Sequence, residues 1–489
     1  MIETQIFTDL YLARADIFLA AAALFLLPLG VFIRERAFHK ISILGVIVLL
    51  LTLTMALQED NSNIPVYLFD GMMVYDRYSV FMKVLVLLGG MAAIFMAVRD
   101  IGGLLHGRFE YVILVLLAVL GMNIMISANN MLTLYIGLEL QSLALYILAA
   151  FNRNSLHSSE AGLKYFILGA LSSGMLLFGI SLIYGFAGTT SFPAIAQVIE
   201  LGEPMTGAMP LTVGLVFVLV GIAFKISAVP FHMWTPDVYQ GAPSCVTAFF
   251  AMAPKIAAIA LLGRLLFSVF GDMQGEWVQI LYALSMASMV VGAFAGLAQK
   301  NIYRLLAYSS IGHMGYALMG FISGTNEGVT ATLVYMAIYL VMTAGTFAMI
   351  LSIRNKDDMA ATEMSDFSGL SERHRMISYG IAIMMFSMAG IPPLAGFFGK
   401  LFVFKAAVDG GHITLAVVGV LTSVVAAYYY LKIIKIMFFD QPLANATFAV
   451  QPMNIMRFVA IPAVIFIVTY ILFPDWLVYE AAQAAATLQ

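Results

Sequence analysis

The sequence predicts an all-α membrane protein that crosses the bilayer about fourteen times. Hydrophobic residues make up 62% of the chain, charged residues make up 10%, and the mean hydropathy is +0.96. A soluble domain carries roughly 25% charged residues, so this chain has too little polar surface to face water on all sides. A bilayer is the solvent that fits such a composition.

About fourteen apolar segments are long enough to span the membrane, which takes about 20 apolar residues in a helix. They run over 16–33, 41–57, 79–98, 109–127, 131–151, 162–186, 211–229, 245–270, 278–298, 303–322, 329–353, 376–408, 413–438 and 455–473. Acidic residues precede the first segment, so it is expected to be a retained helix rather than a signal peptide. The seventh segment runs into Pro230, and the twelfth contains Pro392-Pro393. Because proline removes a backbone donor, helices 7 and 12 are expected to be broken.

Lysine and arginine are distributed unevenly between the loops. Loops after odd-numbered spans hold most of them, such as Arg34, Lys300 and Arg373, whereas the opposite loops and both termini hold only Arg14 and Arg77. Basic loops of inner-membrane proteins lie on the cytoplasmic side. The chain is therefore expected to be a multi-pass protein of the bacterial inner membrane with both termini in the periplasm.

An internal duplication is visible in outline. Spans 4–8 and 9–13 each contain five helices, and the fourth helix of each set is proline-interrupted and carries a lysine, Lys225 or Lys400. Consecutive five-helix units must have opposite orientations, which is the inverted-repeat plan of many ion transporters. A chance pairing of two kinked helices is the alternative. The expected parts are a three-helix segment, two five-helix repeats and a C-terminal helix with its tail, at 1–108, 109–270, 278–438 and 439–489.

Ionisable residues inside the spans are costly and need a reason. Lys225, Lys255 and Lys400 each lie near a proline, where a helix break exposes carbonyls and admits water. Glu139 is the only carboxylate expected well inside a span. Burial disfavours the charged forms of lysine and glutamate, whereas pairing favours them, so a Glu–Lys pair that opens and closes is a proton switch. A static buried ion pair is the alternative.

Other polar residues in or near the spans leave more than one interpretation open. His313 can pass protons near neutral pH, or it can be a hydrogen-bonded core histidine. Lys83 and Lys405 lie near span ends, where a lysine can snorkel to the headgroups. Arg264 lies deeper and stays undecided, and His232 is expected to be a loop residue.

Several functions are excluded by what the sequence lacks. Its one cysteine, Cys245, cannot build a zinc site or an iron–sulfur cluster. No Gly-x-Gly-x-x-Gly fingerprint of a dinucleotide fold is present. The net charge is −3 with no basic block, so nucleic acid is not an expected partner. No cofactor or metal is therefore expected in this chain.

Two long motifs resemble the antiporter-like membrane subunits of respiratory complex I. They are FKISAVPFHMWTPDVYQGAP at 224–243 and GIPPLAGFFGK at 390–400, and the resemblance covers essentially the whole chain. Both motifs match the N-type subunit of bacterial proton-pumping NADH:quinone oxidoreductase, and Lys400 favours that type over its sister subunits. The resemblance implies a translocase subunit without a redox site of its own.

The resemblance also implies roles and partners. A proton relay would use Glu139, Lys225, Lys255 and Lys400, with His313 as a further member. NADH, flavin, iron–sulfur clusters and quinone would lie in partner subunits of the membrane-bound complex. Two alternatives remain: a subunit of a multi-subunit cation/proton antiporter, which fits the motif at 224–243 poorly, and a stand-alone solute carrier.

Overall fold

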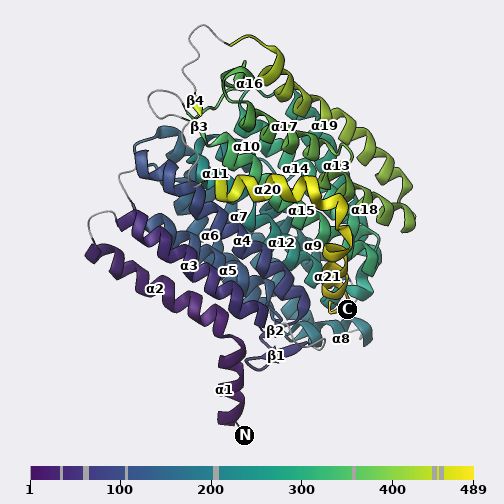
Figure 1. Ribbon diagram of the computed structural model, residues 1–489. Helices are drawn as coiled ribbons and strands as arrows, with labels where there is room; N and C mark the ends of the chain where they lie inside the picture. The colour runs from purple at the N-terminus through teal and green to yellow at the C-terminus, as the bar shows by residue number, and fades with distance from the viewer. Residues whose placement is uncertain are drawn as a thin grey trace.

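A computed structural model describes residues 2–33, 37–58, 65–104, 108–201, 209–354, 360–442, 449–450 and 456–488. Nearly all of these residues form helices packed side by side (Figure 1). The helices before the first break are α1 (Ile2–Leu12), α2 (Arg14–Ile33), α3 (Ala37–Gln58), α4 (Arg77–Leu104), α5 (Glu110–Ile126), α6 (Met131–Ala149), α7 (Leu156–Ala187), α8 (Phe192–Leu201) and α9 (Met209–Ile226).

The remaining helices include several short pieces. They are α10 (Trp234–Gly241), α11 (Ser244–Ala251), α12 (Ala253–Arg264), a π-helix (Leu265–Val269), a 3₁₀ turn (Gly271–Met273), α13 (Gln274–Leu297), α14 (Ile302–Ile322), α15 (Asn326–Ile350), a 3₁₀ turn (Met364–Phe367), α16 (Leu370–Arg373), α17 (Arg375–Ala389), α18 (Ala395–Asp409), α19 (Ile413–Phe439), α20 (Arg457–Thr469), a 3₁₀ turn (Tyr470–Leu472) and α21 (Pro474–Ala486).

Two small antiparallel ladders complete the secondary structure of the described residues. Strand β1 (Val66–Leu68) pairs with β2 (Met73–Tyr75), and β3 (Ile353–Arg354) pairs with β4 (Ala449–Val450). The first ladder lies at the end of the bundle where both termini lie, and the second lies at the opposite end (Figure 1). The sequence analysis expected neither ladder, because each joins segments of only two or three residues.

Ten helical stretches are long and apolar enough to cross a membrane, or eleven if the bent pair α20–α21 counts as one span. That pair bends by 92° after Leu472, and α21 was not expected from the sequence. Shorter apolar helices occupy three further expected spans, at α5, α9 and α17. The chain is thus a multi-pass helical membrane protein. A count of fourteen crossings requires that α5, α9 and α17 each belong to a full span and that the bent pair counts as one.

The expected interruptions lie where the prolines are. α9 ends at Ile226, and Ser227 has a left-handed φ of 64° before the cis bond to Pro230. α17 ends at Ala389, the next residue Gly390 has a φ of 86° suited to glycine, and α18 begins only after Pro392-Pro393. The span over 245–270 is also interrupted, as expected from the proline beside Lys255: Met252 leaves helical geometry between α11 and α12, two residues before Pro254.

Close contacts at glycines determine how near the helices that carry the site lie to their neighbours. A Cβ at Gly121 of α5 would lie 2.7 Å from Gly137 O of α6, two residues before Glu139. A Cβ at Gly292 of α13 would lie 2.6 Å from Gly312 N of α14, next to His313. Small residues allow backbones to approach this closely in membrane proteins. The glycines therefore fix the positions of α6 and α14.

Candidate functional site

Three buried lysines lie beside three helix breaks. Lys225 is the penultimate residue of α9, Lys255 lies in the first turn of α12, and Lys400 lies in the second turn of α18. Their exposed fractions are 5%, 0% and 5%. Breaks leave carbonyls and short polar segments inside the bundle, where an ammonium finds acceptors that a continuous helix would not offer.

The first lysine contacts hydroxyl groups of α6. Lys225 Nζ donates to Ser142 Oγ at 2.6 Å and to Tyr146 OH at 3.4 Å. Glu139 lies one turn before Ser142 on the same helix and forms no ion pair with Lys225. The Oε1 atom of Glu139 is buried and has no hydrogen-bond partner among the described residues. Lys225 therefore binds α6 one turn away from Glu139, and no ion pair forms between these two expected partners.

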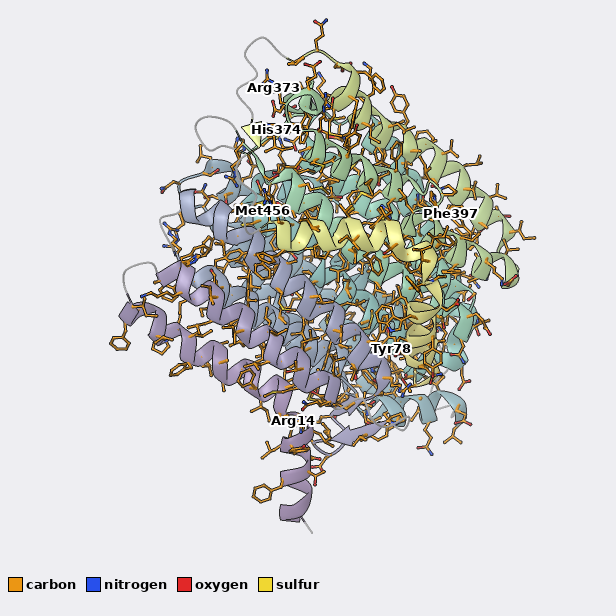
Figure 2. The ribbon with its side chains drawn as sticks, in the orientation of Figure 1. Arg14, Tyr78, Arg373, His374, Phe397 and Met456 are labelled. Atoms are coloured by element: carbon orange, nitrogen blue, oxygen red, sulfur yellow. The ribbon has the colours of Figure 1, made fainter. Side chains whose placement is uncertain are left out.

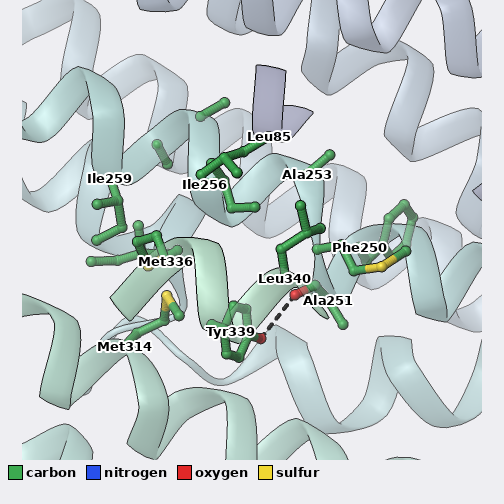
Figure 3. Packing of buried hydrophobic residues seen from close by; sticks show 14 of the residues in the cluster. Leu85, Phe250, Ala251, Ala253, Ile256, Ile259, Met314, Met336, Tyr339 and Leu340 are labelled. Carbon is green, nitrogen blue, oxygen red and sulfur yellow. Dashed lines mark hydrogen bonds between the residues drawn. The ribbon is translucent and has the colours of Figure 1, made fainter. Parts of the chain in front are cut away.

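The second lysine begins a chain of hydroxyl groups. Lys255 Nζ donates to Ser310 Oγ, which in turn shares a hydrogen bond of 2.9 Å with Tyr339 OH. Tyr339 OH donates to Ala251 O at 2.8 Å, as the dashed line of Figure 3 marks. The lysine is thus held at the α11–α12 break by α14 and α15.

His313 is the centre of a second chain. Its Nδ1 lies 2.6 Å from Tyr335 OH, and its Nε2 lies 3.2 Å from Tyr430 OH. Tyr430 OH also shares a hydrogen bond with Ser309 Oγ. Both ring nitrogens of the histidine therefore have a hydroxyl partner that can donate or accept, so either tautomer is accommodated.

The third lysine uses the carbonyls freed by the α17–α18 break. Lys400 Nζ donates to Met388 O at 2.9 Å, to Ala389 O at 3.0 Å and to Ser423 Oγ at 2.7 Å. A cavity of about 10 Å³ is lined by both His313 and Lys400, together with Ser309 and Tyr430. This is roughly the room that one water molecule needs.

The arrangement can move protons but offers little else. Every member is a lysine, a histidine, a carboxylate or a hydroxyl, and each can accept and release a proton at a defined atom. Within the described residues, no group of three His, Cys, Asp or Glu side chains is placed to hold a metal. His232 lies between α9 and α10, half-buried, and its Nδ1 has no partner in the described part of the chain.

The remaining basic residues form structural pairs, which corrects one expectation. Lys83 does not reach the headgroups: it is 1% exposed and pairs with Asp16 at 2.7 Å. Arg264 binds both carboxylate oxygens of Asp76, at 2.8 and 2.9 Å. Asp16 and Asp76 are thus buried carboxylates near the starts of α2 and α4, whereas Glu139 lies in the middle of α6 and is partly buried. Lys405, in contrast, is exposed, as expected near a span end.

The expected residues therefore form two groups. The structure brings Lys255, His313 and Lys400 into one region around α14, and it keeps Glu139 with Lys225 around α6. The sequence analysis missed the hydroxyls of the group around α14: Ser309, Ser310, Tyr335, Tyr339 and Tyr430. Their spacing in the sequence could have indicated them, because polar residues four positions apart lie on one face of a helix.

The matching family model is described as NADH:quinone oxidoreductase/Mrp antiporter, TM, and it covers residues 128–426. Among curated proteins, the chain is 49% identical over 464 residues to NADH-quinone oxidoreductase subunit N of Paramagnetospirillum magneticum, covering 94% of each chain. It is 55% identical over 379 residues to the protein of the same name from Parvibaculum lavamentivorans, covering 78% of each.

Solved structures agree in fold. A chain of respiratory complex I from Thermus thermophilus with bound aureothin is 32% identical, with 96% of this chain and 99% of that chain covered and a TM-score of 0.80. A chain of the Mrp complex from Dietzia sp. DQ12-45-1b is 22% identical, with 98% and 97% covered and a TM-score of 0.85. The second likeness shows the fold alone.

Proposed function

This chain belongs to the NADH-quinone oxidoreductase subunit N family, and we propose that it carries protons across the membrane arm of respiratory complex I through its buried lysines. Its relatives are named as subunits of an oxidoreductase, and the corresponding activity here is that of a translocase. Electron transfer would take place in other subunits, which would hold NADH, flavin, iron–sulfur clusters and quinone.

One observation carries the proposal. Lys255 binds Ser310 of α14, one helical turn before His313, and Lys400 lines a water-sized cavity together with His313. Burying several lysines is costly, and a static scaffold would need an acidic partner for each of them. Neither Lys255 nor Lys400 has an acidic partner in the described part of the chain. Side chains that change their protonation account for this excess of lysines.

Glu139 and Lys225 form the driving element of the proposal. In one state the ammonium binds Ser142, as it does here, and in the other it binds the carboxylate. Closing the pair favours the charged form of both groups, and opening it favours the neutral forms. A proton would therefore leave the pair for Lys255 when the pair opens.

The topology completes the proposal. The chain would cross the bacterial inner membrane about fourteen times, with two inverted repeats at 109–270 and 278–438, a three-helix segment at 1–108 and a C-terminal part at 439–489. Figure 1 supports placing both termini on the same side of the membrane, because they lie toward one end of the bundle. In Figure 2, Arg373 and His374 of a basic loop lie at the opposite end from Arg14. The basic end would be cytoplasmic.

Affinity purification of the tagged chain tests the assignment. We expect subunits that oxidise NADH and reduce quinone to purify with it, and we expect the membranes to pump protons when NADH is added. Co-purification with cation/proton antiporter subunits alone would instead support the alternative that the Mrp-like fold leaves open. Uptake of a solute by vesicles that contain only this chain would contradict both.

A further inference from the structure

A wide apolar groove lies between α18 and α19. It has a volume of about 490 Å³, and Figure 1 shows α19 along the outer edge of the bundle. Several side chains that line the groove are exposed, among them Leu401, Val417 and Leu421. The groove shares no lining residue with the cavity around His313. An exposed apolar surface of this size marks a contact with lipid or with another protein.

The groove follows one face of α18 toward the turn that leads into α19. On α18 it is lined by Leu401, Phe404, Lys405 and Val408, which recur every three or four residues and therefore lie on one side of the helix. The same spacing continues to Asp409, which is exposed and ends α18. The groove thus runs from an apolar stretch to a rim that carries one positive and one negative side chain.

The lining of the groove differs from a surface that receives another helix. Interfaces between membrane helices are enriched in small residues, which let two backbones approach closely. On α19 the groove is lined by Ile413, Val417, Val420 and Leu421, and by one small residue, Ala416. Branched walls of this kind keep a second backbone at a distance but accommodate a flexible acyl chain.

The charged rim is complementary to a headgroup with two charges. Lys405 and Asp409 lie one helical turn apart, yet neither forms an ion pair with a described residue. A lysine can lay its stem along an apolar surface and extend its ammonium toward the headgroups. There the ammonium can donate to a phosphate, and the Asp409 carboxylate can accept from a primary ammonium.

We propose that this groove binds one phospholipid with an ethanolamine headgroup. An acyl chain would lie between α18 and α19, the phosphate would bind Lys405, and the ammonium would bind Asp409. A glycerol headgroup brings no cation to Asp409, and a choline headgroup has no N–H to donate to it. The site does not depend on the proton-carrying function proposed above, because the lipid needs only to meet the folded chain in a bilayer.

Photo-crosslinking in the intact complex tests the site. The complex is placed in bilayers that contain phosphatidylethanolamine with a photoreactive acyl chain, and the labelled peptides are identified by mass spectrometry. We expect label on residues 401–421, and Val417→Trp should remove most of it because the larger side chain occupies the groove. Val424→Trp is the matched control, because Val424 is exposed on the same helix and does not line the groove.

Two results would overturn the site. Equal labelling of residues 401–421 in Val417→Trp and Val424→Trp would show that the lipid does not occupy the groove. Absence of label on these residues in the unchanged complex would show that a neighbouring subunit covers them.

Recognition of the headgroup is measured with the same acyl chain on three lipids. Phosphatidylethanolamine should label the groove about two- to fivefold more than phosphatidylcholine or phosphatidylglycerol, the preference expected from exposed ionic contacts. Asp409→Asn should remove the preference for ethanolamine over choline. Glu276→Gln should keep it, because Glu276 is an exposed carboxylate in the first turn of α13. Equal labelling by the three lipids in the unchanged complex would overturn the proposed headgroup contacts.

Discussion

Lys225 donates to Ser142 Oγ at 2.6 Å, one helical turn from Glu139, rather than to the Glu139 carboxylate. The buried Oε1 atom of Glu139 has no partner among the described residues. An unpaired buried carboxylate atom is costly when charged. The observed arrangement is therefore the open one of the proposed switch, in which the ammonium binds Ser142.

Lys225→Ala should lower proton pumping and the NADH:quinone turnover coupled to it, while the complex still assembles. The change removes the ammonium that the proposed switch moves between Ser142 and Glu139, and a loss of about 1.4 kcal/mol in the transfer step already slows it roughly tenfold. Pumping is measured by dye quenching in membrane vesicles, after the amount of assembled complex has been checked.

Lys164→Ala is the control for this measurement, because Lys164 is a half-exposed lysine of α7 that pairs with Glu160 and Asp237. It should pump normally. Near-normal pumping in Lys225→Ala would revive the static-pair interpretation.

The pair of Lys83 and Asp16 should behave as a structural element. Lys83→Met leaves a buried carboxylate that, among the described residues, keeps hydrogen bonds from Tyr75 and Asn123 without a cation, so it should destabilise the protein by about 3–5 kcal/mol. Changing Asp16→Leu as well should restore most of that loss, because two apolar groups of similar volume need no pairing. Thermal unfolding of the single and double variants measures the coupling. Additive effects would contradict this prediction.

The helical fold could be predicted from hydrophobicity, because spans of about 20 apolar residues are a direct consequence of bilayer thickness. The breaks at Pro230 and Pro392-Pro393 were also readable, since proline acts locally. The break at Met252 lies two residues before Pro254, the proline that indicated an interruption beside Lys255. The β1–β2 ladder is joined to residues 127–129, which follow α5, and could not be inferred from three-residue strands.

The sequence indicated the charged residues of the candidate site but not the hydroxyl groups to which they are hydrogen-bonded. Lys225, Lys255 and Lys400 stand out because lysine is expensive in a bilayer. Serine and tyrosine are common in membrane helices, so Ser309 and Tyr430 carry no such signal. Asp16 was overlooked because it lies next to Arg14 at a helix start, where a carboxylate is usually solvated. Only the folded arrangement shows that it faces Lys83.

Ionisation of Asp237 should make the free energy of unfolding depend on pH. Burial alone would raise the pKa of the Asp237 carboxyl, but hydrogen bonds from Lys164 and Arg304 outweigh burial and hold that pKa below its usual value. A lowered pKa stabilises the fold above the unfolded value near 3.9, and that contribution is lost as the pH falls below about 4.

Asp237→Asn should therefore lower the unfolding temperature at pH 7 and have little effect at pH 3. The carboxylate is more than a third exposed, so the contribution is about 1 kcal/mol or less after solvent screening. Glu160→Gln, which removes a more exposed pair with the same lysine, should change less at either pH. An equal loss at both pH values for Asp237→Asn would contradict the ionic origin.

Reporter fusions test the orientation. A reporter after Gln489 should read periplasmic, and one inserted after Arg373 should read cytoplasmic, because basic loops remain on the cytoplasmic side. At each position, one reporter that is active only in the periplasm and one that is active only in the cytoplasm give a positive signal for either orientation. A cytoplasmic C-terminus would mean that one crossing was wrongly added or missed.

Lys400 is held by three acceptors at the α17–α18 break, and two of them are the carbonyls of Met388 and Ala389. These carbonyls stabilise the ammonium without a negative charge that would fix it permanently. Moving one charge against 100 mV takes about 2.3 kcal/mol, so a group that releases protons must change its proton affinity by a comparable amount. Hydration through the cavity shared with His313 can supply that change.

Lys400→Met should therefore abolish most pumping, because it keeps the length of the side chain and removes the proton. Lys400→Glu should keep part of it, since a protonated carboxyl can still donate to one of the freed carbonyls. Lys405→Met is the control, being an exposed lysine on the same helix. The measurement is protons moved per NADH oxidised in vesicles. If Lys400→Met pumps normally while Lys255→Ala does not, protons leave the protein before they reach α18.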